Sequence, residues 1–211
     1  MIENKAPWYY QYLDLPKVPD QFVQEALALA HNSEKNKLEN SNDLDVLPVY
    51  NRTIYIDGKP AKSRMTPRWD LSQEFVNWVR DNICEEFIDV AVSISKGDPD
   101  AVNTGVHTDN VRHYTLIYLL ETSNDDQITA WWQEPGFPIQ RSERGYYKES
   151  WDSLVPLEKV VFPKFTWLVF NAGILHSIHN IYGHRIAIHV SLPYDPFTKD
   201  NYFKTKQRID E

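Results

Sequence analysis

The apolar positions near the start of the chain recur at helical spacing. Asp20 is placed to cap a helix that continues through QFVQEALALAHN, where Val23, Leu27 and Ala30 fall on one face. The polar stretch that follows, residues 32–46, has no apolar period and is predicted to be a mobile loop. The first third of the chain therefore predicts at least one amphipathic helix.

A second helix is predicted to begin near Asp70. This residue and Gln73 have the spacing of a capping box. One face of the predicted helix is apolar, so it should pack on a sheet. The residues of that face are Leu71, Phe75, Trp78, Val79 and Ile83.

From about residue 90 the apolar residues instead form short runs with the composition of strands. The runs are VAVSIS, YTLIYLL, ITAWW, KVVF, TWLVF, HSIHN and IAIHVSL. With TIYI, which precedes the hairpin-turn pair Asp57-Gly58, they make about eight strands, the number in a double-sheet jelly roll. No helical pattern separates these strands, which argues against a parallel α/β fold. We expect a mainly β, cupin-like jelly roll with N-terminal helices.

The length of 211 residues fits a single domain, residues 1–211. Its helical part is expected over about residues 1–87 and its β core over about residues 88–195. The segment 135–158 is long and aperiodic, which fits a substrate lid and an exposed loop equally well.

Charge makes some partners unfavourable, and the cysteine content rules out two kinds of site. The net charge is −8, from 22 Lys and Arg against 30 Asp and Glu, which makes nucleic acid an unfavourable partner and works against binding to anionic membranes. Cys84 is the only cysteine, so an intramolecular disulfide and a thiolate zinc cluster are both excluded. The chain has no apolar run of membrane-spanning length, and we expect a soluble cytoplasmic protein.

Candidate metal ligands stand where a strand-like run begins. In HTDNVRHYTLIYLL, His107 and Asp109 are two residues apart, so in extended backbone both side chains point to the same side. Such a pair is common by chance, and on its own it fits a polar loop better than a metal site.

Another histidine and an arginine near the C-terminus change this balance. In HSIHNIYGHRIAIHVSL, His176 opens one extended run and Arg185 opens the next. The isoleucines and valine of the last run share one face, so Arg185 points the other way, with Ala187 and His189. An arginine directed into the interior of a barrel requires an anion. Two histidines and a carboxylate form the facial triad of non-haem Fe(II) oxygenases, and the arginine adds a fork for a dicarboxylate.

The order His-x-Asp, distal His, Arg resembles the Fe(II)/2-oxoglutarate-dependent dioxygenase superfamily. PKFTWLVFNAGILHSIHNIYGHRIAIHVSL and HTDNVRHYTLIYLLE are similar to its prolyl-hydroxylase-like branch, and the resemblance covers roughly residues 88–192. It implies a double-stranded β-helix in which His107, Asp109 and His176 bind iron. It also implies that Arg185 pairs with the C5 carboxylate of 2-oxoglutarate, and that O2 is the second cosubstrate.

The resemblance also guides the choice between nearby candidates. His179 is an alternative third ligand, but it lies six residues from Arg185, whereas His176 has the family spacing of nine. The family often adds a hydroxyl to the C5 carboxylate, for which Ser95, Thr115 and Tyr118 are the candidates. The branch usually has a tyrosine near the position of Ser95, and this chain has none there.

Substrate contacts are assigned to Arg112, His113 and Trp132, although the first two fit a solvated strand end as well. Trp131 and Trp132 should face opposite sides of one strand. The expected activity is hydroxylation of a C–H bond in a peptidyl substrate, prolyl included, or in an amino-acid-like small molecule, with release of succinate and CO2. A zinc hydrolase or isomerase on a cupin-like barrel, and a non-catalytic binding barrel, remain alternatives. The zinc enzyme would have no need of Arg185.

Overall fold

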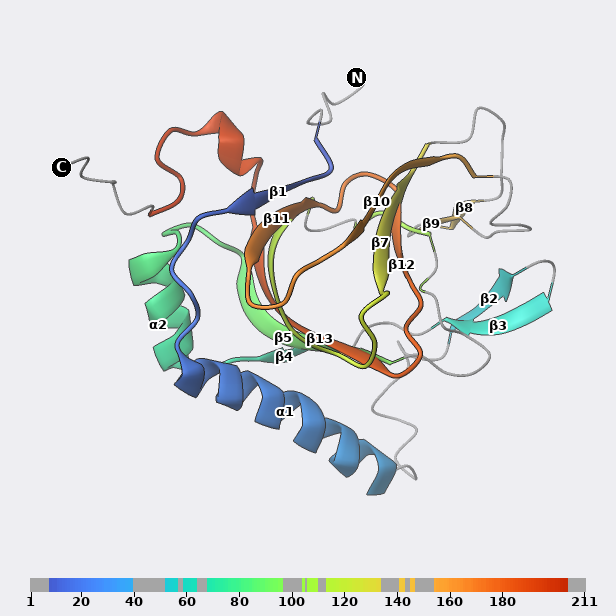
Figure 1. Ribbon diagram of the computed structural model, residues 1–211, viewed down its shortest axis with the longest axis horizontal. Coiled ribbons are helices and arrows are strands. Elements are labelled where there is room, and N and C mark those ends of the chain that lie inside the picture. Colours follow the sequence, from blue (N-terminus) through green and yellow to red (C-terminus); the bar gives the residue numbers. More distant parts are fainter. Residues whose placement is uncertain are drawn as a thin grey trace.

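The computed structural model describes residues 8–39, 52–56, 59–63, 68–96, 104, 106–109, 113–133, 141–142, 145–146 and 154–204. Two antiparallel sheets form a mainly β, jelly-roll architecture, and two helices lie outside it (Figure 1). The mainly β fold with N-terminal helices is confirmed. Among the described helices, none has the length and apolar character needed to cross a membrane.

The large sheet has six strands in the order β1-β11-β6-β13-β5-β4. The small sheet has three, in the order β10-β7-β12, and an isolated bridge between His107 and His176 extends it on the β12 side. The large-sheet strands are β1 (Tyr10–Leu13), β4 (Arg68–Asp70), β5 (Asp89–Lys96), β6 (Tyr114–Thr122), β11 (Trp167–Asn171) and β13 (His184–Leu192). The small-sheet strands are β7 (Ile128–Trp132), β10 (Pro156–Val161) and β12 (His176–His179).

Helices α1 (Asp20–Glu39) and α2 (Gln73–Asn82) cover the outer face of the large sheet (Figure 1). Phe22 of α1 and Phe75 of α2 pack in one buried cluster with Ile186 and Ile188 of β13. The alternation predicted for β13 is therefore confirmed. Its isoleucines face the helices, and Arg185 faces the space between the sheets.

Both helix boundaries differ from the prediction. The N-cap of α2 is Ser72, whose hydroxyl accepts a hydrogen bond from the Phe75 backbone N–H, whereas Asp70 ends strand β4 and pairs with Ala91. Asp70, which the capping-box pattern assigned to the start of the helix, therefore belongs to the sheet instead. Helix α1 continues to Glu39 through the first half of the predicted loop 32–46, and residues 40–46 lie outside the described ones.

All eight predicted runs form strands, but the described residues contain five further short strands, and one predicted strand lies outside the two main sheets. TIYI forms β2 (Arg52–Ile56), which pairs with β3 (Lys59–Ser63) and belongs to neither described sheet; the turn at 57–58 lies outside the described residues. The large sheet instead includes β1 and β4, two short strands at its edges that have too few residues for a clear alternation. Within the aperiodic segment 135–158, the structure describes the short pair β8 (Arg141–Ser142) and β9 (Gly145–Tyr146) and the start of β10.

Candidate metal centre and dicarboxylate pocket

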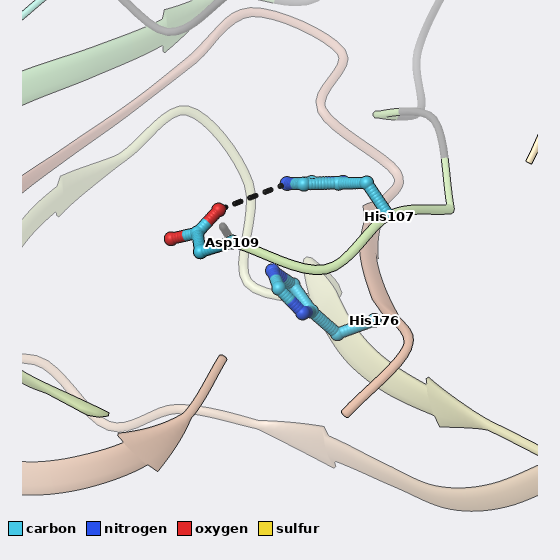
Figure 2. A group of neighbouring side chains, drawn as sticks. All are labelled: His107, Asp109 and His176. Atoms are coloured by element: carbon cyan, nitrogen blue, oxygen red, sulfur yellow. Dashed lines mark ion pairs between the residues drawn. The ribbon is translucent and has the colours of Figure 1, made fainter. Parts of the chain in front are cut away.

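His107, Asp109 and His176 lie together at the edge of the small sheet, with their side chains pointing toward one another (Figure 2). His107 and His176 exchange both backbone hydrogen bonds, at 3.0 and 2.9 Å, which brings the two imidazoles to 4.5 Å between ring centroids. The Asp109 backbone N–H donates to Ala172 O at 2.9 Å and so holds the carboxylate on the same side. Backbone hydrogen bonds thus help to set the positions of all three side chains.

The donor atoms of the three residues all lie within 4.8 Å of one another. His107 Nε2 and Asp109 Oδ1 lie 3.7 Å apart (Figure 2). His176 is buried, and the other two side chains are partly exposed. Two imidazole nitrogens and one carboxylate grouped in this way would suit a divalent metal that takes its further ligands from the cavity side.

The orientation of His176 is set by its second ring nitrogen. Nδ1 lies 2.8 Å from Ile174 O, and because a carbonyl can only accept, Nδ1 carries the proton. The Nε2 lone pair is then available for a metal, which is the usual arrangement of metal-binding histidines. The Phe170 ring packs edge-on against the imidazole at 4.7 Å and limits its rotation.

A cavity of roughly 100 Å³ runs between the sheets from the three candidate ligands to Arg185. Its walls combine apolar side chains with several hydroxyl groups. The hydroxyl-bearing residues are Ser93, Ser95, Thr104, Thr115 and Thr129, and the large apolar ones are Ile117, Phe162, Phe170 and Ile178.

Arg185 is a buried cation at the far end of this cavity. Its exposed fraction is 5%, and burial lowers its pKa to about 10, so the guanidinium stays charged at neutral pH. Nη1 donates a hydrogen bond to Thr129 Oγ1 at 3.2 Å, and the guanidinium carbon lies 5.4 Å from the centre of the Phe162 ring. Within the described ranges no carboxylate forms an ion pair with it. A buried cation whose described partners are a hydroxyl and an aromatic face favours an anionic ligand.

The three hydroxyl residues that the sequence suggests beside Arg185 do not all face the cavity. Ser95 lines the cavity directly opposite Arg185 in the β5–β13 register. Thr115 also lines it, and its buried hydroxyl has no hydrogen-bond partner among the described residues. Tyr118 faces the helices instead, in contact with Trp167, because even-numbered residues of β6 point away from the cavity.

Sequence reasoning missed Thr129. It lies on β7 opposite Ile178, is fully buried, and contacts Arg185 across the cavity. The alternation of ITAWW predicts that Thr129 and Trp131 share one face of the strand. It does not say which face of the strand lines the cavity.

Of the three substrate candidates, the structure describes His113 and Trp132, and it does not bring these two together. Arg112 lies outside the described residues. His113 is exposed, and its carbonyl accepts from the backbone N–H groups of Ala172 and Gly173 beside the metal ligands. Trp132 is buried on the outer side of the small sheet, where its Nε1 donates to Ser177 Oγ at 2.7 Å, and it is not part of the cavity wall.

Trp131 packs between the sheets with Phe162 and Phe170, so the predicted opposition of the two tryptophans is confirmed. The alternative ligand His179 shares the outer side with Trp132. Its Nε2 lies 2.7 Å from Ser177 Oγ, and burial, with a smaller effect from Lys159, lowers its pKa to about 4. Among the described residues, the group that could hold a metal ion contains His176 and not His179.

No protein-family model matches this sequence, and a search of curated proteins found no match. Among solved structures, the chain is similar to HygX from Streptomyces hygroscopicus with nickel and 2-oxoglutarate bound, at a TM-score of 0.43 and 14% identity, over 86% of this chain and 81% of that one. It is also similar to AviO1 from Streptomyces viridochromogenes Tue57, at a TM-score of 0.44 and 11% identity, over 89% and 91% of the two chains. Similarity at these values does not assign a function.

Proposed function

We propose that this protein is an Fe(II)- and 2-oxoglutarate-dependent oxygenase. The observation that carries the proposal is that one cavity joins a cluster of two histidines and an aspartate to a buried arginine with no carboxylate partner among the described residues. The first group suits a divalent metal with open positions, and the second suits the far carboxylate of a dicarboxylate.

Each residue has a defined task in this proposal. His107, Asp109 and His176 hold the metal, and the His176 Nδ1–H bond to Ile174 O keeps Nε2 directed at it. Arg185 binds the C5 carboxylate, and Thr129 orients the guanidinium and offers its hydroxyl to the same group. Ser95 and Thr115 line the intervening wall. When bound, iron and 2-oxoglutarate supply oxidation by O2 with release of succinate and CO2.

A zinc hydrolase would use the same three ligands, but it would leave Arg185 without a function. Burying an arginine without a carboxylate costs stability, so its retention in the wall of the metal cavity supports a reaction that uses an anionic cosubstrate. We further propose hydroxylation of a C–H bond, in a peptidyl or amino-acid-like substrate, as the outcome.

The test is anaerobic titration of the metal-free protein with Fe(II) and then 2-oxoglutarate, following the visible metal-to-ligand charge-transfer band of the chelate. His176→Ala should lose metal binding. Arg185→Ala should keep Fe(II) binding but lose the band at 2-oxoglutarate concentrations that saturate the parent protein. His184→Ala, which changes a partly exposed histidine beside Arg185, is the matched control and should behave as the parent.

A band in the parent that both cavity variants weaken would support the proposal. A parent protein that binds zinc or iron but gives no band with 2-oxoglutarate would contradict it and favour the hydrolase. If no metal binds at all, the binding barrel becomes the better interpretation.

A further inference from the structure

One turn of the chain supplies two backbone carbonyls that orient candidate metal ligands. The turn, residues 171–174, begins with the last residue of β11 and leads to β12. The Ala172 carbonyl accepts the Asp109 backbone N–H at 2.9 Å, and the Ile174 carbonyl lies 2.8 Å from His176 Nδ1. A displacement of this turn would therefore disturb two of the three candidate ligands at once.

The side chain of Asn171 holds this turn through two hydrogen bonds. Its Oδ1 accepts the Gly173 backbone N–H at 3.2 Å, and its Nδ2 donates to Trp8 O at 3.0 Å. A flipped amide would bring two donors together at Gly173 and two acceptors together at Trp8, so these partners fix which amide atom is which. The side chain thus braces the turn internally and ties it to the N-terminal segment.

The backbone of Asn171 adds two further connections. Its N–H donates to Tyr9 O at 2.8 Å, and its carbonyl accepts from Trp131 Nε1 at 3.3 Å. Asn171 is only 2% exposed, and its side-chain partner Trp8 is 163 positions away in the chain. Moving a buried residue with this many paired polar groups would leave donors or acceptors unsatisfied, which is costly. The residue therefore fixes the turn in one position.

We propose that Asn171 is a positioning residue of the metal centre. It acts through the turn 171–174, whose carbonyls orient Asp109 and His176. The proposal rests on the function proposed above, because it assumes that the candidate ligands bind a divalent metal. Loss of a group that orients metal ligands typically weakens metal binding roughly tenfold to a hundredfold.

A purely structural role makes a different prediction. If the bonds of Asn171 only hold the N-terminal segment on the sheet, their loss should lower stability and leave metal affinity unchanged.

Asn180, just after β12, offers a matched comparison. Its Nδ2 also donates to a backbone carbonyl, that of Asp126, at 3.0 Å, and its φ of 63° is one that alanine adopts only with strain. Asn180→Ala should therefore lower stability without moving the turn that orients the ligands.

The experiment is anaerobic calorimetric titration of the metal-free protein with Fe(II), combined with urea denaturation of each metal-free variant. Asn171→Ala should bind Fe(II) roughly tenfold to a hundredfold more weakly than the parent. Asn171→Ser should lie between the two, because its hydroxyl can still accept the Gly173 N–H but is too short to replace the bond to Trp8. Asn180→Ala should bind Fe(II) as the parent does, although its stability falls.

Parental Fe(II) affinity in folded Asn171→Ala would overturn the proposal. An equal loss of affinity in Asn180→Ala would also overturn it, because metal binding would then follow general stability. If Asn171→Ala does not fold, Asn171→Ser decides by the same criterion. A parent protein that binds no Fe(II) would overturn the proposed function together with this inference, whereas equal binding by the parent and the Asn171 variants would overturn this inference alone.

Discussion

Arg185 Nη1 donates a hydrogen bond to Thr129 Oγ1 at 3.2 Å, and this bond joins the large sheet to the small sheet across the cavity. Both residues are buried. The bond fixes one end of the planar guanidinium, so the remaining N–H groups keep a defined direction for a carboxylate. Binding of the cosubstrate should therefore depend on both residues, and to different degrees.

Thr129→Val tests how much the threonine hydroxyl contributes to cosubstrate binding, which we expect to be less than the contribution of Arg185. Valine has nearly the same shape, so the loss is confined to a hydroxyl, and we expect the affinity for 2-oxoglutarate to fall about fivefold, from about 1 kcal/mol of hydrogen-bond free energy. The measurement is titration of the charge-transfer band, with Fe(II) affinity measured separately and expected to be unchanged. Thr166→Val, at a threonine whose hydroxyl bonds only locally to Lys164 O, is the control.

Arg185→Met tests whether the arginine is kept for function at the expense of stability. Methionine fills a similar volume without a buried charge, so the free energy of unfolding of the metal-free protein should rise by about 1–3 kcal/mol. The stabilisation that 2-oxoglutarate gives to the Fe(II) form should disappear. Urea denaturation with and without 2-oxoglutarate measures both effects, and a marked loss of stability in the metal-free variant would contradict the argument.

His179 should make the protein sensitive to mild acid. Burial lowers its pKa to about 4, while the unfolded chain has the ordinary value of 6.5. The unfolded state therefore binds a proton first, and the stability contributed by neutral His179 is lost as the pH falls from 6.5 toward 4. Urea denaturation across this range should show a shallower decline for His179→Gln than for the parent. Gln24→Ala, at an exposed residue of α1 that does not titrate, should keep the parental slope.

Gly183 allows the turn before Arg185 to approach β6 closely. A Cβ at this position would lie 2.6 Å from Ser123 Cβ, while Ser123 exchanges hydrogen bonds with the backbone of His184. Gly183→Ala should lower the free energy of unfolding by about 1–2 kcal/mol, because one of the two segments must shift. The double variant with Ser123→Gly should recover part of the loss in a double-mutant cycle. Purely additive effects would show that the contact is not the cause.

Strand periodicity alone predicted much of the site. The two-residue spacing of His107 and Asp109 correctly placed both candidate ligands on one side, and the alternation of β13 correctly placed Arg185 toward the interior. These predictions succeeded because side-chain direction in a strand is a local property with a period of two. The same rule correctly separated Trp131 from Trp132.

Strand periodicity could not predict which side chains contact one another in the site, because the contacting residues lie on different strands. Thr129 reaches Arg185 only because β7 and β13 face each other, and Tyr118 misses the cavity because the helices cover its side of β6. Arg68 joins the wall only because a three-residue edge strand pairs with β5, and the same pairing moved the start of α2 from Asp70 to Ser72. The sequence by itself determined which way each candidate side chain points along its own strand. The packing of two sheets and two helices decided which of those side chains meet, because their contacts join residues far apart in the chain.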